Sequence, residues 1–223
     1  MSVDMLKNEQ QLIEQRIEVP NKWCAAIQAT LKTKAPPLPY KKFSELQPGD
    51  VLLIQASGLS KAINGADNLL SGNNESQASH TVLYLKEVNG VKHFLENIPH
   101  EGPRIIFEDE FIKRYGPRGA QVAKLAQPLK DEQASELYKA AVEMAAKNHR
   151  AIVISPWLGS NYGVRGEDNV VCSEADWALL RSAGQKIPES GDRLKADLGI
   201  DFSPADFYKN KQFFLVSPID MPH

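Results

Sequence analysis

Two strand-like runs around a tight-turn dipeptide constrain the fold of this 223-residue chain more than any other feature. The first run is His80-Thr-Val-Leu-Tyr-Leu85, the second is Val91-Lys-His-Phe-Leu-Glu96, and Asn89-Gly90 lies between them. β-Branched and aromatic residues favour strands, and Asn-Gly favours the positive φ angles of a hairpin turn. The middle of the chain is therefore predicted to form an antiparallel hairpin.

Further strands and helices are predicted on both sides of this hairpin. Short apolar runs at Val51–Ile54 and Gln121–Ala126 predict two more strands. Apolar residues at helical spacing predict one helix that begins at Asp131 and another over Cys172–Ala183, with Gly184 as its C-cap. An antiparallel sheet packed against helices is the expected result, which is an α+β domain.

Residues 1–39 are predicted to form a helical extension in front of the main domain. Apolar residues recur at helical spacing before and after Pro20, and the stretch Lys34–Pro39 contains three prolines that cannot continue a helix. This stretch reads as a stiff linker. The domain boundary is therefore predicted near Pro39, with residues 40–223 as the main domain.

Composition and charge exclude several classes of protein. Lys plus Arg is 26 and Asp plus Glu is 28, a net charge of -2, which gives no reason to expect nucleic acid as a partner. Two cysteines suggest neither a disulfide framework nor a zinc site. No apolar run has the length of a signal peptide core or of a membrane span. Synthesis in the cytoplasm is expected, and export by a specialised secretion system would leave no trace in the sequence.

Cys172 is the candidate nucleophile because it opens a predicted helix. A thiol at a helix N-terminus faces unpaired backbone N–H groups and the positive end of the helix dipole, and both favour the reactive thiolate. The alternative is that Cys172 is a small buried hydrophobic residue. Cys24 lies in the middle of a predicted helix, where nothing lowers a thiol pKa, so we expect it to serve in packing.

His80 is the candidate base because it begins a strand directly after a polar loop, where catalytic groups are often presented. A histidine can take the thiol proton and later return it to the leaving group. The alternative is a surface or hydrogen-bonded histidine without a catalytic role. The other histidines compete for the role with weaker arguments: His93, His100, His149 and His223.

Glu96 is the candidate third residue, which would orient the imidazole of His80. The register of the hairpin decides whether it can do so. A two-residue turn pairs Leu83 with Glu96 and puts Glu96 on the sheet face opposite His80. A three-residue loop that ends at Gly90 pairs Val82 with Glu96 and puts it on the same face as His80. The assignment of Glu96 therefore needs the second register.

Two fallbacks and one expectation accompany this assignment. Asn97 or Glu101 would inherit the role if Glu96 points away from the site. As a strand carboxylate at an exposed edge, Glu96 is expected to contribute little to stability, so Glu96→Gln should leave the fold intact.

Several short segments together resemble one known family. They are Gly49-Asp50-Val-Leu-Leu53, Ser79-His80-Thr-Val-Leu83, Phe94-Leu-Glu96 and Val171-Cys172-Ser173-Glu174 with Trp177. The set is similar to the permuted NlpC-type group of papain-like cysteine hydrolases, the YiiX-like branch. His80 precedes Cys172 in this chain, which is the permuted order. The resemblance covers roughly residues 43 to 214 and does not extend to the N-terminal helices.

The resemblance implies a circularly permuted papain-like fold and a catalytic triad of Cys172, His80 and Glu96. It also implies that Tyr162, ten residues before the cysteine, lines the site near the oxyanion position. A thioester mechanism of this kind requires no metal or organic cofactor. The unusually charged loop between Tyr162 and Cys172 departs from the pattern and leaves substrate preferences open.

Three functions fit these residues. The first is an amidase or endopeptidase acting on bacterial cell-wall peptide, including an exported antibacterial effector with an immunity or secretion partner. The second is a phospholipase or lipid acyltransferase of the lecithin:retinol acyltransferase-like type, with the same triad. The third is a binding module that kept the fold without catalysis, against which the three intact triad residues argue. The partners expected are therefore a peptide or lipid acyl substrate, without nucleic acid or a transmembrane segment.

Overall fold

The computed structural model describes residues 41–55, 78–98, 101–154, 172–189 and 202–222. The chain separates into two units, Met1–Leu38 and Pro39–His223, and all described residues belong to the second. The extension predicted over residues 1–39 lies outside the described residues. In the described part of the chain, no helix is long and apolar enough to cross a membrane.

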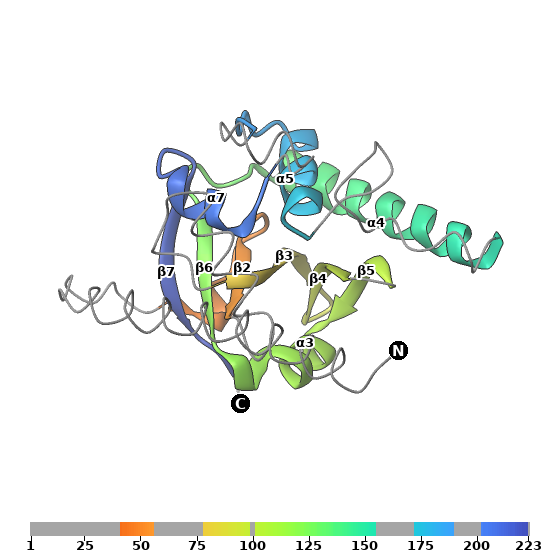
Figure 1. The fold of residues 1–223 in the computed structure, drawn as a ribbon, viewed down its shortest axis with the longest axis horizontal. Coiled ribbons are helices and arrows are strands. Elements are labelled where there is room, and N and C mark those ends of the chain that lie inside the picture. Colours follow the sequence, from red (N-terminus) through yellow and green to blue (C-terminus); the bar gives the residue numbers. More distant parts are fainter. Residues whose placement is uncertain (1–40, 56–77, 99–100, 155–171, 190–201, 223) are drawn as a thin grey trace, which may run out of the picture. The chain divides into compact units, whose positions relative to one another are not determined.

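The main domain is built on a mixed sheet whose strands run in the order β1-β7-β6-β2-β3-β4-β5 (Figure 1). All neighbouring strands are antiparallel except β1 and β7, which are parallel. The strands are β1 (Lys41–Lys42), β2 (Val51–Gln55), β3 (Ala78–Val88), β4 (Val91–Ile98), β5 (Gly102–Phe107), β6 (Ala120–Leu125) and β7 (Phe214–Asp220).

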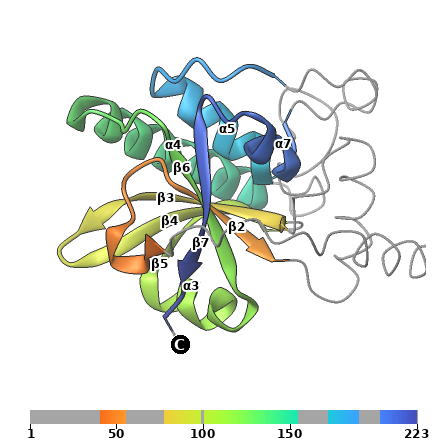
Figure 2. The same ribbon diagram turned by 90° about the vertical axis from the view of Figure 1, so that its left-hand side faces the viewer.

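Helices cover the two faces of the sheet unequally. Three helices, α4 (Asp131–Ile154), α5 (Cys172–Ser182) and α7 (Pro204–Lys209), lie on one face, and α3 (Glu108–Tyr115) lies on the other (Figure 2). Two single turns, η1 (Phe43–Glu45) and η2 (Gly116–Arg118), complete the described elements. Each face has its own buried apolar cluster, because successive strand residues point to opposite faces. The predicted α+β class is confirmed.

The predicted helices and central strands form close to their expected bounds. The helix that begins at Asp131 continues through Ile154, and the helix that begins at Cys172 ends at Ser182. Gly184 has φ +88°, and the second helix is closed by backbone hydrogen bonds from Gly184 N–H to Arg181 and from Gln185 N–H to Leu180. Strand β5, helix α3 and strand β7 were not predicted from the sequence.

The hairpin combines features of both predicted registers. Its turn has two residues, Asn89 (φ 53°) and Gly90 (φ 80°), and Val88 pairs with Val91. The register then shifts between Tyr84 and Lys86, where one extra residue on β3 forms a β-bulge. As a result, Val82 pairs with Glu96.

The bulge therefore decides which way Glu96 points. A tight turn with regular pairing would have put Glu96 on the face opposite His80, but the extra residue returns it to the same face. The two-residue turn agrees with the first predicted register, and the face on which Glu96 lies agrees with the second.

Candidate active site

Cys172 is the first residue of α5 and is 5% exposed. The start of α5 is fixed by Ser173, whose Oγ donates a hydrogen bond of 2.7 Å to the carbonyl oxygen of Phe202. Further along the helix, Trp177 donates through Nε1 to the carbonyl oxygen of Ile187 at 3.2 Å and stacks on Phe202. The helix N-terminus predicted for Cys172 is confirmed, and the contacts of Ser173 and Trp177 hold this part of α5 in place.

The thiol lies where strands β3 and β4 part. Their pairing ends at Val82 and Glu96, although β3 begins at Ala78 and β4 continues to Ile98. The backbone N–H and C=O of Tyr84 are hydrogen-bonded to Asp50 and Gly49, on the β2 side of β3. Because successive strand residues direct these groups to alternate sides, Thr81 directs its N–H to the β4 side. This N–H and the Thr81 hydroxyl both act on the thiol of Cys172.

The electrostatic surroundings keep this thiol protonated. Burial raises the pKa of Cys172 to about 11, and the carboxylate of Asp176 adds to the rise. The backbone N–H groups of Thr81 and Ser173 and the hydroxyl of Thr81 oppose it without cancelling it. From the sequence, the helix N-terminus was expected to lower this pKa. Burial outweighs the helix terminus because a thiolate loses its hydration in the closed interior.

Asp176 lies one helical turn after Cys172 and is 2% exposed. Its Oδ2 is buried and forms no hydrogen bond with a described residue. Burial raises the pKa of Asp176 to about 8, and the Thr81 hydroxyl reduces the rise. An unpaired carboxylate in such a place is costly, so the neutral acid is the favoured form at neutral pH.

His80 lies near the start of β3, next to Thr81 in sequence. Its ring centroid is 5.6 Å from that of Tyr115, at the end of α3. Burial lowers the pKa of His80 to about 3, and the charges of Arg118 and Arg114 add to the effect. The imidazole is therefore neutral at physiological pH, which is the form that can accept a proton.

Buried polar atoms without a hydrogen-bond partner gather at this place. Within the described ranges they include Ser79 Oγ, His80 Nε2, Thr81 Oγ1 and Asp176 Oδ2. Three of these residues are consecutive on β3, and the fourth is on the helix that packs against β3. Such atoms are rare in folded proteins and call for a functional or structural explanation. Two of these residues, Thr81 and Asp176, act on Cys172, so this end of the sheet is the candidate site.

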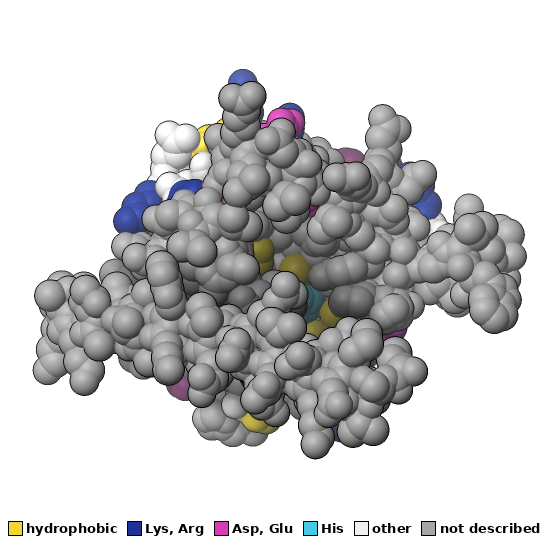
Figure 3. Space-filling model, viewed as in Figure 1, with side chains coloured by type: hydrophobic (Ala, Val, Ile, Leu, Met, Phe, Trp, Pro, Cys, Tyr) yellow, Lys and Arg dark blue, Asp and Glu magenta, His cyan; other side chains and the backbone are white. Residues whose placement is uncertain are grey.

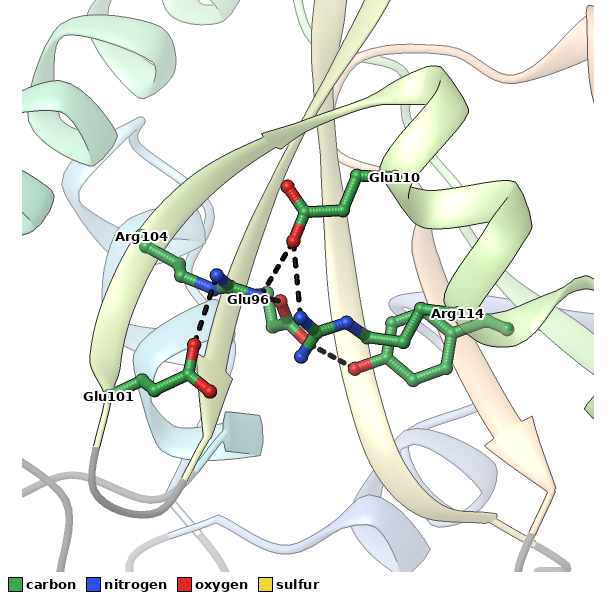
Figure 4. Close-up of polar contacts among 6 residues, drawn as sticks. Glu96, Glu101, Arg104, Glu110 and Arg114 are labelled. Carbon is green, nitrogen blue, oxygen red and sulfur yellow. Dashed lines mark hydrogen bonds and ion pairs between the residues drawn. The ribbon is translucent and has the colours of Figure 1, made fainter.

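Glu96 is fully buried on β4 and is surrounded by cations and a hydroxyl (Figure 4). Arg104 donates to its Oε2 from Nη2 at 2.8 Å and from Nε at 3.1 Å. Arg114 donates to Oε1 at 3.3 Å, and the hydroxyl of Tyr115 donates to the same oxygen. Glu110 accepts from both arginines, at 2.9 and 3.1 Å, and so extends the network.

This arrangement corrects two expectations about Glu96. No hydrogen bond joins Glu96 to His80 among the residues that the structure describes, so the direct contact predicted from the sequence is not formed here. Glu96 is also not an exposed edge carboxylate, because its side chain is 0% exposed. Tyr115 lies between the two groups, since its hydroxyl contacts Glu96 and its ring packs against His80.

The remaining candidates occupy different places. Asn97 is buried on β4 and, by alternation, faces the α5 side, whereas Glu101 is exposed and pairs with Arg104 at 2.9 Å. His93 is hydrogen-bonded to the hydroxyl of Tyr138 at 2.9 Å. The other candidates lie outside the residues whose side chains are described: Tyr162, Cys24, His100, His149 and His223.

Sequence reasoning missed Thr81, Asp176 and Tyr115. Asp176 follows Cys172 by four residues, so the helical repeat alone places it on the same side of α5 and could have identified it. Thr81 could be found only from the packing of α5 on β3. Tyr115 belongs to α3, which the sequence pattern did not predict.

The described residues include no group of three or more His, Cys, Asp or Glu side chains that could hold a metal ion. The expectation that the reaction needs no cofactor stays a prediction. The chemistry available at the site is that of a buried thiol with backbone N–H groups around the sulfur. The neutral imidazole of His80 belongs to the residue before Thr81, and by alternation it faces the Glu96 side of the sheet.

Comparisons with known proteins bear on the fold. No protein-family model matches the chain, and no curated protein matches it. Among solved structures, the chain is similar to the crystal structure of metalloprotein yiiX from Escherichia coli O157:H7, a DUF1105 protein. The identity is 19%, the TM-score is 0.54, and the match covers 79% of this chain and 98% of the other. At this identity the similarity concerns the fold alone: the chain has a YiiX-like α+β fold.

Proposed function

We propose that this protein is a cysteine hydrolase of the papain-like type, with Cys172 as nucleophile and His80 as base. One observation carries the proposal. The cysteine opens a helix at the point where two strands part, against the residue that follows His80, and buried polar atoms without partners gather there. The YiiX-like fold and the order of His80 before Cys172 are consistent with the permuted arrangement that the sequence motifs suggest.

The mechanism follows from the charge states of the two groups. Because the thiol and the imidazole both rest neutral, His80 must take the thiol proton as Sγ attacks the substrate carbonyl carbon. The oxyanion would accept a hydrogen bond from the backbone N–H of Cys172, and Tyr162 is the proposed second donor. His80 then gives its proton to the leaving group as the carbon–nitrogen bond breaks and a thioester remains. Water, deprotonated by His80, attacks the thioester and releases the thiol.

Glu96 is the third residue of the proposed triad, but it acts on His80 through Tyr115 and not by direct contact. Its carboxylate accepts the hydrogen bond of the Tyr115 hydroxyl, and Tyr115 in turn packs against the imidazole of His80 and holds that ring in place. This differs from direct orientation, in which the carboxylate would accept the second imidazole N–H.

The proposed substrate is an amide bond in bacterial cell-wall peptide. The alternative, a lipid acyl group, uses the same thioester chemistry. The described side chains visible at the centre of Figure 3 are hydrophobic, with a histidine among them, which suits an acyl chain as well as a peptide. An exported antibacterial role with an immunity partner belongs to the first alternative.

Mass spectrometry of candidate substrates tests the proposal directly. Cell-wall fragments and phospholipid vesicles are incubated separately with the protein, with Cys172→Ala, and with Cys24→Ala as the matched control. We expect product from cell-wall peptide with the unaltered protein and with Cys24→Ala, but none with Cys172→Ala. Product from phospholipid alone would replace the substrate assignment, and product that persists in Cys172→Ala would overturn the cysteine mechanism.

A further inference from the structure

A buried acid lies on the same side of α5 as the cysteine. Asp176 follows Cys172 by one helical turn, and the two side chains are 2% and 5% exposed. The side chain of Thr81, on β3, acts on both of them. Neither Thr81 Oγ1 nor Asp176 Oδ2 forms a hydrogen bond of ordinary geometry with a described residue. Three polar groups are thus enclosed together, and the described residues leave two of them unsatisfied.

Among the residues that the structure describes, no cation pairs with Asp176. The arginines of the region serve other carboxylates: Arg104 and Arg114 pair with Glu96 on the opposite face of the sheet, and Arg181 pairs with Glu189. The other titratable groups on the elements around this part of α5 include His80 on β3, His93 on β4, Tyr138 on α4, Glu174 on α5, and Asp206 and Tyr208 on α7.

These neighbours do not change the equilibrium between the protonated and the ionised form of Asp176. His93 is bound to Tyr138, and Asp206 accepts hydrogen bonds from Ser203. Burial and the Thr81 hydroxyl are the influences on Asp176 that the described residues supply. A carboxylic acid so enclosed favours its protonated form at neutral pH, and its ionisation at higher pH places a negative charge one turn from the thiol.

We infer that Asp176, in its protonated form and together with the hydroxyl of Thr81, is a positioning residue that controls the ionisation of the Cys172 thiol. The thiol can become a thiolate while Asp176 is neutral. Once Asp176 loses its proton, its charge opposes a second negative charge on Sγ, because the two groups titrate as a coupled pair. This inference deepens the proposed function and rests on it only for the consequence in catalysis.

The consequence is that the nucleophilicity of Cys172 rises less steeply at alkaline pH than that of an isolated cysteine. An isolated thiol becomes steadily more reactive as the pH rises toward its pKa. In this site the ionisation of Asp176 begins first and flattens that rise.

The test is the rate at which iodoacetamide alkylates Cys172, followed by mass spectrometry between pH 6 and pH 10 in the folded full-length protein. In Asp176→Asn a neutral amide of the same shape replaces the acid. We expect the ratio of the variant's rate to the wild-type rate to be near one at pH 6 and to rise to about tenfold by pH 9–10, since one pKa unit is a tenfold change. The matched control is Asp131→Asn, which changes the net charge equally at an exposed position and should keep the ratio near one.

A ratio that stays constant across this pH range would overturn the inference, because a merely structural role gives no pH dependence. If Asp176→Asn does not fold, Thr81→Val takes its place. Loss of the hydroxyl should slow alkylation of Cys172 at every pH, and Thr81→Ser should restore the rate. Unchanged alkylation in Thr81→Val would equally contradict the inference. Labelling needs no substrate, so these outcomes are independent of whether the proposed hydrolase activity is found.

Discussion

The buried carboxylate of Glu96 shows at the scale of one residue how packing changes the meaning of a side chain. From the sequence it is a strand residue near a turn. In the structure it is fully enclosed and accepts hydrogen bonds from Arg104, Arg114 and Tyr115. Both arginines are about one-third exposed, so the network joins a buried anion to cations that remain partly hydrated. Its contribution to stability comes chiefly from satisfying the buried group.

Glu96→Gln is therefore expected to destabilise the domain. The amide keeps the shape but loses the charge and presents a donor where two acceptors are needed. Removing one partner of a buried, hydrogen-bonded charge costs roughly 1–3 kcal/mol, discounted here from larger values because both arginines reach solvent. Urea unfolding measures the change. The control is Glu101→Gln, whose side chain is 50% exposed and pairs with Arg104, and it should cost less than about 1 kcal/mol. Equal effects in the two variants would contradict this explanation.

At the scale of elements, the β3–β4 hairpin determines the geometry of the site. The two-residue turn sets the initial register, and the bulge before it in β3 shifts that register by one residue. Leu85 and Lys86 then both lie on the α4 side of the sheet: Leu85 is buried there, and Lys86 lies over the ring of Tyr138. The bulge thus brings two successive residues of β3 to the same side of the sheet.

Gly90→Ala tests the turn separately from the bulge. Gly90 has φ +80° and open space around the position of an added Cβ, so the cost comes from the backbone alone. Left-handed backbone costs a residue with a side chain roughly 1–2 kcal/mol, and the free energy of unfolding should fall by that amount. Asn89→Gly is the control: that position is already left-handed, and the change should stay within about 0.5 kcal/mol. A neutral Gly90→Ala would mean that the turn relaxes to another type.

At the scale of the whole molecule, the buried titratable groups make stability depend on pH. His80 has a pKa lowered to about 3, so between that value and its unfolded pKa of 6.5 the unfolded chain holds the extra proton, and stability rises with pH. Asp176 has a pKa raised to about 8, so above its unfolded pKa of 3.8 the folded state holds the extra proton, and stability falls with pH. The two trends oppose each other between about pH 4 and 6.5.

Asp176→Asn should separate these two contributions. Without the acid, the decline in unfolding free energy from pH 6.5 to 8 should disappear. Between pH 5 and pH 8, the unfolding free energy of the variant should rise relative to that of the wild type by roughly 2–4 kcal/mol. The reason is that one proton linked to folding changes this free energy by about 1.4 kcal/mol for each pH unit. Urea unfolding at both pH values measures this difference. A gap between variant and wild type that is the same at pH 5 and pH 8 would show that Asp176 titrates normally in the folded protein.

The sequence by itself determined the local elements and the positions of the main chemical groups. Turn chemistry and strand propensity are local, so the hairpin around Asn89 and Gly90 could be predicted, and the helical repeat with a glycine C-cap located the helix that Cys172 opens. The amphipathic helix beginning at Asp131 was predictable for the same reason.

Only the tertiary structure decided the geometry and the charge states. The face of Glu96 depends on a bulge in β3, and no local sequence pattern revealed that bulge. The pKa values of Cys172, His80 and Asp176 depend on how much water the assembled domain excludes, and desolvation here outweighs the helix N-terminus that the sequence argument relied on. Tyr115 and its arginine neighbours reach the site from α3 and β5, which short-range periodicity did not predict. Burial and strand register are properties of the packed chain, so the sequence could name the cysteine and the histidine but not the surroundings that control their ionisation.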